Sequence, residues 1–230
     1  MSERAARRRP AAVLEHGAEP IPGLPEPLPP GERILWQGRP VFASLARRAF
    51  HLRAVAGYFV LLALWKLVTG LYDGAGWAAA GLDAFGLVVP AGLAIGVLAL
   101  LALAYARSTI FTITDRRVVI RFGVALPMAV NLPFRQIAGA AVGVFRDGTA
   151  DLPLTLAGPD RVAWLHLWPF VRPWRLRHPE PMLRAVPNGA EVARILRTAL
   201  EQAAAARTAE ASAEGREAAA ARTGPLAAAA

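Results

Sequence analysis

The 230-residue chain contains no cysteine and only one lysine. The missing cysteines exclude disulfides, thiolate metal sites and cysteine nucleophiles. Lys66 is the single lysine among 26 basic residues, so arginine carries nearly all of the positive charge that gives the chain its net +9. We interpret the arginine excess as a composition bias of the coding genome.

Motifs that support catalysis are also missing. The sequence has no glycine-rich phosphate loop, no nucleophile elbow and no metal-binding helix. Asp147, Asp151 and Asp160 fall in predicted loops without a nearby histidine, and loop aspartates usually terminate turns. No histidine has a second ligand at metal spacing, and no nucleic-acid-binding motif occurs. We expect a non-enzymatic protein with no cofactor, no metal and no nucleic-acid partner.

Two long apolar runs are present. Residues 54–72 are interrupted only by Lys66 and Thr69, and residues 84–106 carry no charge. At about 1.5 Å per helical residue, each run can cross a hydrocarbon core of about 30 Å. Lys66 is expected to snorkel toward the headgroups. The alternative, two buried helices of a soluble protein, is less favoured because such long uncharged runs are rare in globular cores. The runs predict a transmembrane hairpin.

Arginines flank the hairpin, whereas residues 73–83 between the spans contain no basic residue. The positive-inside rule therefore places both flanks, and with them both termini, in the cytoplasm. We interpret the arginines as topology determinants that also attract anionic lipid headgroups. The four nearest to the spans are Arg47, Arg48, Arg53 and Arg107.

The remaining sequence divides by composition. Residues 1–30 are proline-rich and predict a disordered or loosely docked arm. Residues 107–202, which follow the hairpin, should form a folded domain. Residues 31–53, which precede the hairpin, predict a strand and a basic segment that join this domain. Alternating β-branched residues predict a small antiparallel barrel or sandwich. The predicted strands are 108–114, 118–122, 125–132, 137–145, 152–157 and 162–168.

A helix is predicted to close this domain. Asn188 and Glu191 have the spacing of a capping box, and an apolar stripe runs from Val192 to Leu200. Residues 203–230 are alanine-rich, and we expect frayed helix or disorder there.

The segment from Trp168 to Arg175, which is rich in aromatic residues and arginine, is the first candidate binding site. Prolines deny this segment regular hydrogen bonding, so it should lie on the surface as an extended strap. Aromatics with arginines suit a protein interface. Equally, the tryptophans could pack on the domain itself, which would leave Arg172 as the better contact. The candidate partner-binding residues are Trp168, Phe170, Arg172, Trp174 and Arg175.

Gly92 and Gly96 form a small-xxx-small pair in the second span. Such pairs let helices approach closely, and we favour packing against the first span over packing against a partner helix or a second copy of the chain. Pro90 is expected to kink the same helix.

Four stretches carry a family resemblance. They are residues 34–40 (ILWQGRP), 56–59 (AGYF), 131–135 (NLPFR) and 167–174 (LWPFVRPW). Across roughly residues 21–200 the chain resembles the PuhB-type photosynthetic complex assembly proteins of purple bacteria, within the bacterial pleckstrin-homology-like membrane proteins.

The resemblance implies an α+β membrane protein, with a two-helix transmembrane hairpin and a small antiparallel PH-like domain capped by a C-terminal helix. It implies a multi-pass protein of the bacterial inner or intracytoplasmic membrane. Its role would be to assemble the reaction centre by binding reaction-centre subunits, with light-harvesting subunits as further candidates. The alternative is a PH-like membrane protein that binds anionic lipid or a stress-related partner.

Overall fold

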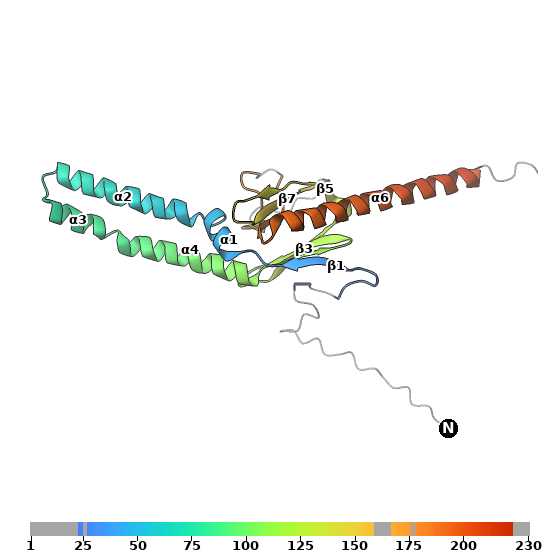
Figure 1. The fold of residues 1–230 in the computed structure, drawn as a ribbon, viewed down its shortest axis with the longest axis horizontal. Coiled ribbons are helices and arrows are strands. Elements are labelled where there is room, and N and C mark those ends of the chain that lie inside the picture. Colours follow the sequence, from blue (N-terminus) through green and yellow to red (C-terminus); the bar gives the residue numbers. More distant parts are fainter. Residues whose placement is uncertain (1–22, 25–26, 159–166, 176–177, 223–230) are drawn as a thin grey trace, which may run out of the picture.

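The computed structural model describes residues 23–24, 27–158, 167–175 and 178–222. A helical hairpin extends from one end of a β domain, and a long helix extends from the other end (Figure 1). Most of the predicted arm lies outside the described residues. Leu24 is buried, with 1% of its surface exposed, so the chain is docked onto the domain at this point.

The first sheet brings together strands from both sides of the hairpin. Its antiparallel order is β1 (Ile34–Gly38), β2 (Ile110–Thr114), β3 (Arg117–Phe122) and β4 (Met128–Pro133). Ile34 of β1 pairs with Thr114 of β2. The hairpin is therefore an insertion between two neighbouring strands, which hold both of its ends on one sheet.

The second sheet is centred on one long strand. β7 (Ala150–Leu156) pairs with β5 (Ile137–Ala140) and β6 (Gly143–Val144) along one side and with β8 (Met182–Val186) along the other. We did not predict β8, because Pro179 and Pro181 precede it directly and Arg184 interrupts its apolar pattern. Most of the strand expected at 162–168 lies outside the described residues.

The hairpin contains more helix than the sequence predicted. After α1 (Phe42–Arg48), the first arm is α2 (Leu52–Tyr72), and the second arm consists of α3 (Trp77–Phe85) and α4 (Val88–Ser108). The expected loop at 73–83 is thus largely helical. The second arm is interrupted at residues 86–87 rather than kinked at Pro90, because Pro90 sits in the first turn of α4, where backbone N–H groups have no acceptor within the helix.

The last third of α4 belongs to the domain rather than to the free hairpin. Ala102 and Ala106 are buried in the same core as Leu45 and Ala46 of α1, and Tyr105 packs against this core. The C-terminal end of the second predicted span, 84–106, therefore belongs to the domain core. At the N-terminal end of this span, α3 extends the apolar helical arm.

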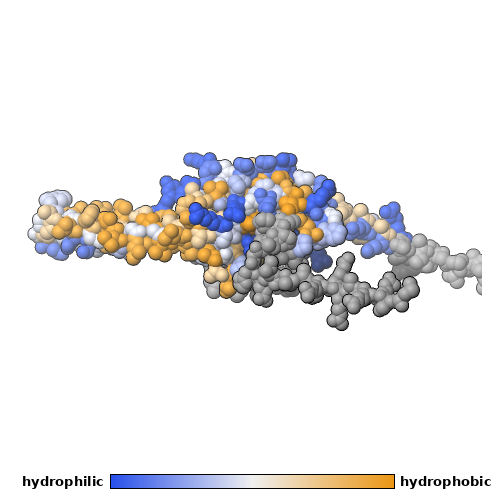
Figure 2. Space-filling view, turned by 90° about the horizontal axis from the view of Figure 1, so that it is seen from below, coloured by the Kyte–Doolittle hydropathy of each residue, from blue (hydrophilic) through white to orange (hydrophobic). Residues whose placement is uncertain are grey.

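The rest of the hairpin exposes apolar side chains on nearly all sides. No residue of α2 is buried, and Figure 2, which looks at the molecule from below, shows a mostly hydrophobic surface along the hairpin. Both arms are long and apolar enough to cross a membrane. The large exposed apolar residues are Tyr58, Val60, Leu61, Leu64, Trp65, Val68, Tyr72, Trp77, Leu82, Phe85, Val88, Val89, Leu93, Val97 and Leu100.

The closing helix is longer than expected. α6 runs from Gly189 to Arg222, so residues 203–222, where we expected frayed helix or disorder, continue the helix. Alanine has the highest helix propensity, which favours this conformation even where the helix packs on nothing. The predicted apolar stripe is confirmed, since Val192, Leu196 and Ala199 are buried against the sheets.

Candidate functional site

Phe170 lies at the centre of the domain core and not on a binding surface. It is fully buried, and its ring centroid lies 5.4 Å from that of Phe111, 5.6 Å from that of Phe122 and 6.3 Å from that of Tyr105. The structure therefore contradicts its assignment as a partner contact.

Trp168 joins the domain to the base of the hairpin. Its ring makes edge-to-face contacts with Phe50, between α1 and α2, at 5.3 Å and with Tyr105 of α4 at 5.8 Å. Such pairs stabilise packing beyond the burial of area alone. Trp168 thus fits the alternative in which the tryptophan packs on the chain itself.

The other three residues of the predicted strap remain at the surface. Arg172 and Arg175 both lie near the buried carboxylate of Glu180, with N–O distances of 2.8 and 3.6 Å. Trp174, between them, is 94% exposed. One carboxylate shared by two guanidinium groups leaves a net positive charge beside an exposed indole, which is a combination suited to partner contact.

Arg47 and Arg48 connect α1 to the turn between β6 and β7 through ion pairs. Both donate to Asp147, at 2.8 and 2.9 Å, and the guanidinium of Arg48 stacks 3.4 Å from the ring centroid of Phe145. The single carboxylate of Asp147 offsets only one of these two charges, so the pair gains a structural role and still leaves a net positive charge beside the hairpin. This pairing joins residues about 100 positions apart, so no local pattern of residues indicates it.

Arg53 and Arg107 are exposed, as is Arg47. Arg53 lies in the first turn of α2, and Arg107 lies in the last turn of α4, where the helix dipole favours a cation. These two residues keep the predicted basic character of the hairpin base.

Asp147 has a strongly lowered pKa. The Thr149 hydroxyl donates to its carboxylate and Arg48 adds a further donor, so its pKa falls from 3.8 to about 2 although burial opposes the shift. A carboxyl group whose pKa is lower in the folded state stabilises the fold above its unfolded pKa. That contribution to the free energy of unfolding is lost as the pH falls through the pKa that Asp147 has in the folded state.

The free energy of unfolding is accordingly expected to drop by about 1–2 kcal/mol between roughly pH 4 and pH 2, an amount discounted for the partial exposure of the group. Asp147→Asn should remove this part of the pH dependence and lower the stability at pH 7 by a similar amount. Urea titrations of the detergent-solubilised chain across this range measure both effects. Asp73→Asn, at the exposed tip of the hairpin, is the control, and an identical pH profile for wild type and Asp147→Asn would contradict the assignment.

The glycine pair of α4 does not pack against α2. A Cβ added at Gly92 or Gly96 would meet no atom within 4 Å, so the expected packing within the hairpin is wrong. The close approach is made elsewhere, where a Cβ on Gly70 would lie 3.1 Å from that of Ala80 in α3. The face of α4 that carries Gly92 and Gly96 is open.

Lys66 also has a neighbour that the sequence did not predict. Its ammonium lies 3.9 Å from a carboxylate oxygen of Asp83 in α3. We expected this lysine to snorkel alone. Because α3 runs back along α2 (Figure 1), it brings a carboxylate from the supposed loop to the level of the lysine.

Arg184 of β8 was missed by sequence reasoning. It is only 8% exposed, and it donates to the carbonyl oxygens of Pro169 and Arg48, both at 3.1 Å. Its Nε atom is buried without a hydrogen-bond partner and lies 3.9 Å from Asp151 Oδ2. Burial lowers the pKa of Arg184, and Arg48 lowers it further, against the attraction of Asp151.

A cavity of about 610 Å³ opens beside Arg184. We name it the junction cavity, because its lining joins the segment before α2 to the proline-rich strap. The lining residues are Ala49, His51, Trp168, Val171, Pro173, Trp174 and Arg184.

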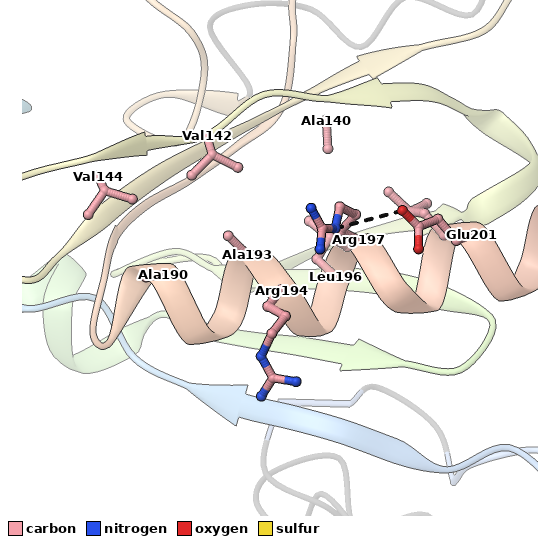
Figure 3. A pocket seen from close by; sticks show the side chains of 10 residues that line it. Ala140, Val142, Val144, Ala190, Ala193, Arg194, Leu196, Arg197 and Glu201 are labelled. Atoms are coloured by element: carbon pink, nitrogen blue, oxygen red, sulfur yellow. Dashed lines mark ion pairs between the residues drawn. The ribbon is translucent and has the colours of Figure 1, made fainter.

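A second hollow of about 530 Å³ lies between α6 and the second sheet (Figure 3). Val142 and Val144 face Ala193 and Leu196 across it, and an ion pair of 3.7 Å joins Arg197 to Glu201 along one rim. The described residues contain no cluster of three or more histidine, cysteine, aspartate or glutamate side chains that could hold a metal ion.

A family model and a relative of known sequence both match most of the chain. Residues 52–200 match the family model of the bacterial PH domain. An uncharacterized 23.7 kDa protein in the puhA 5′ region of Rhodobacter capsulatus is 37% identical over 184 residues, which cover 80% of this chain and 86% of the relative. A crystal structure of a DUF1696 family protein with a pleckstrin-homology domain from Shewanella loihica covers 39% of this chain and 68% of its own, with 13% identity. Its TM-score of 0.27 is too low to indicate a shared arrangement.

Proposed function

Because the chain belongs to the bacterial PH domain family, we propose that it is a non-enzymatic inner-membrane factor for assembly of the photosynthetic reaction centre and its light-harvesting surroundings. The observation that carries the proposal is the relative from the puhA 5′ region, which is 37% identical and matches 80% of the chain. The resemblance to PuhB-type proteins supports the same role.

The exposed hairpin supports membrane anchoring. Soluble proteins rarely expose contiguous apolar patches larger than a few hundred Å², whereas α2 has no buried residue along its whole length. Arg53 and Arg107 lie at the domain end and no basic residue lies at the tip, which under the positive-inside rule supports a cytoplasmic position for the domain and both termini.

Anchoring makes weak contacts sufficient for assembly. Confining the factor and its partner to one membrane raises their effective concentration. We propose that Trp174 and Arg175, with Arg172 at their side, contact a partner subunit at the cytoplasmic surface. The open face of α4 at Gly92 and Gly96 is available to a partner helix or to a second copy of the chain.

Deleting the gene tests this function. Reaction-centre content, measured by absorption of isolated membranes, is expected to fall several-fold, and a wild-type copy should restore it. A copy with both Trp174→Ala and Arg175→Ala should restore it only in part. The matched control, Leu126→Ala with Arg135→Ala, also changes an exposed apolar residue and an exposed arginine, but elsewhere on the domain, and should restore it fully. Unchanged content in the deletion strain would refute the assembly role.

A further inference from the structure

The outer edge of the second sheet is open. Among the described residues, β5 and β6 pair with β7 alone, so residues 137–144 form an edge with one unpaired side. Ala141 of this edge donates its N–H to the carbonyl oxygen of Pro153 in β7 at 3.0 Å. Because neighbouring residues of a strand direct their N–H groups to opposite sides, we expect the N–H of Val142 to point to the unpaired side.

This edge lacks the features that usually protect edge strands. Natural proteins place lysine, other charged residues or proline on such strands, which prevents pairing with another chain. Residues 137–144 (IAGAAVGV) contain no charged residue and no proline. A Cβ added at Gly139 would meet no atom within 4 Å. The backbone of this edge is therefore accessible to a further strand.

The hollow between α6 and the second sheet lies beside the same edge (Figure 3). Ala140, Val142 and Val144 all line it, because every second residue of a strand faces the same side. Val142 and Val144 are 50% and 52% exposed, although Ala193 and Leu196 of α6 lie across from them. The hollow thus offers uncovered apolar surface to the side chains of an added strand.

Exposed arginines surround the hollow. Arg194 and Arg197 of α6 line it, and Arg146 follows two residues after Val144. Glu201, which lies 3.7 Å from Arg197, contributes one negative charge to the lining. Three positive charges against one negative charge leave a net charge of +2 around the hollow. Charge complementarity therefore favours an acidic occupant.

A second copy of the chain fits this edge less well. In an antiparallel pair with residue 137 of one copy opposite residue 144 of the other, Arg135 of each copy would lie opposite Arg146 of the other. Both arginines are exposed. Like charges directly opposite each other destabilise a strand pair, whereas an acidic segment would place carboxylates beside Arg146.

We infer that the edge formed by residues 137–144 binds an extended acidic segment of another protein, which adds a strand to the second sheet. Backbone hydrogen bonds to the edge supply affinity, and alternate apolar side chains of the segment enter the hollow beside α6 and supply specificity. The inference goes beyond the proposed assembly role, because this surface is separate from Trp174 and Arg175 and does not depend on insertion of the hairpin.

Fluorescence anisotropy of labelled peptides with the full chain in dodecyl maltoside micelles tests the inference. The probe is the acidic peptide EVTVTVTVE, and KVTVTVTVK is its charge-reversed counterpart. EVTVTVTVE should bind about tenfold more tightly, because its carboxylates meet the arginines around the hollow. Methylation of every second backbone nitrogen of EVTVTVTVE, on the side that pairs, should abolish binding, because a strand without these donors cannot extend the sheet.

Two surface variants locate the site. Val142→Glu places a carboxylate in the hollow, and Arg146→Glu reverses a charge beside it, so each should weaken the binding of EVTVTVTVE about tenfold. Val124→Glu is the control for the first, since Val124 is 51% exposed but lies between β3 and β4. Arg207→Glu, further along α6, is the control for the second. Both controls should bind as the wild type does.

The possible failures are distinguishable. Circular dichroism identifies a variant that does not fold, and if Val142→Glu is such a variant, Arg146→Glu decides. Equal binding of the acidic and basic peptides, unchanged binding in the folded site variants, or binding of the methylated peptide would overturn the inference. A wild-type dimer that Val142→Glu dissociates, without peptide binding, would assign the edge to a second copy instead. None of these measurements involves the reaction centre, so the deletion experiment tests the assembly role separately.

Discussion

Replacing Phe170 with alanine is expected to lower the free energy of unfolding by about 3–5 kcal/mol, the usual cost of removing a fully buried phenylalanine side chain. Its ring meets Phe111 of β2, Phe122 of β3 and Tyr105 of α4. The substitution would therefore leave a cavity where the first sheet, the hairpin base and the strap converge. Urea denaturation followed by tryptophan fluorescence measures the loss.

Trp174→Ala is the matched control for this prediction. Trp174 lies four positions further along the same strap, and its side chain is almost fully exposed. Its removal should change the unfolding free energy by less than about 0.5 kcal/mol. Equal losses in the two variants would contradict the division of the strap into a core half and a surface half.

Replacing Leu61 with arginine is expected to release much of the protein from the membrane or abolish its accumulation. Leu61 lies near the centre of α2 and is 66% exposed. An arginine at the centre of a span raises the free energy of insertion by about 2.5–3.5 kcal/mol. The measurement is the share of protein that remains in alkaline-washed membranes.

Leu126→Arg provides the comparison, because Leu126 is equally apolar and 79% exposed but lies on the β domain. Water already surrounds this position in the proposed arrangement, so the variant should remain membrane-bound at the wild-type level. If Leu61→Arg and Leu126→Arg fractionate alike, lipid does not surround α2.

The strongest sequence signals were local ones. Two long apolar runs, one of them interrupted by Lys66, predicted the two apolar arms, and α2 begins within two residues of the expected position. Alternating β-branched residues gave the strands β2 and β3. These features can be predicted from residues that are close in sequence, because the spacing of apolar residues within a segment indicates whether it forms a helix or a strand.

The features that the sequence did not reveal depend on contacts between distant residues. Phe170 and Trp174 look alike in a proline-rich stretch, and only the position of the core decides that one is buried and the other exposed. Likewise, Arg48 resembled a free flanking charge until Asp147 was brought to it by the β6–β7 turn. Charge patterns predict the topology of a chain but not which of its arginines find partners.

The insertion of the hairpin between β1 and β2 has a mechanical consequence. Because paired strands hold both of its ends, and α4 shares the domain core through Ala102 and Ala106, the domain cannot swing freely on a linker. In the proposed membrane arrangement, the domain therefore keeps one fixed orientation relative to the membrane. A rigid presentation of this kind suits a factor that positions partner subunits.

The orientation of the hairpin can be measured directly, because the chain has no cysteine of its own. Single cysteines introduced as Asp73→Cys at the tip and Ser212→Cys on α6 would be exposed to a membrane-impermeant maleimide in intact cells whose outer membrane has been permeabilised. We expect Asp73→Cys to be labelled in these cells and Ser212→Cys only after lysis. Labelling of Ser212→Cys before lysis, or of neither site until lysis, would contradict a hairpin that crosses the membrane with its domain in the cytoplasm.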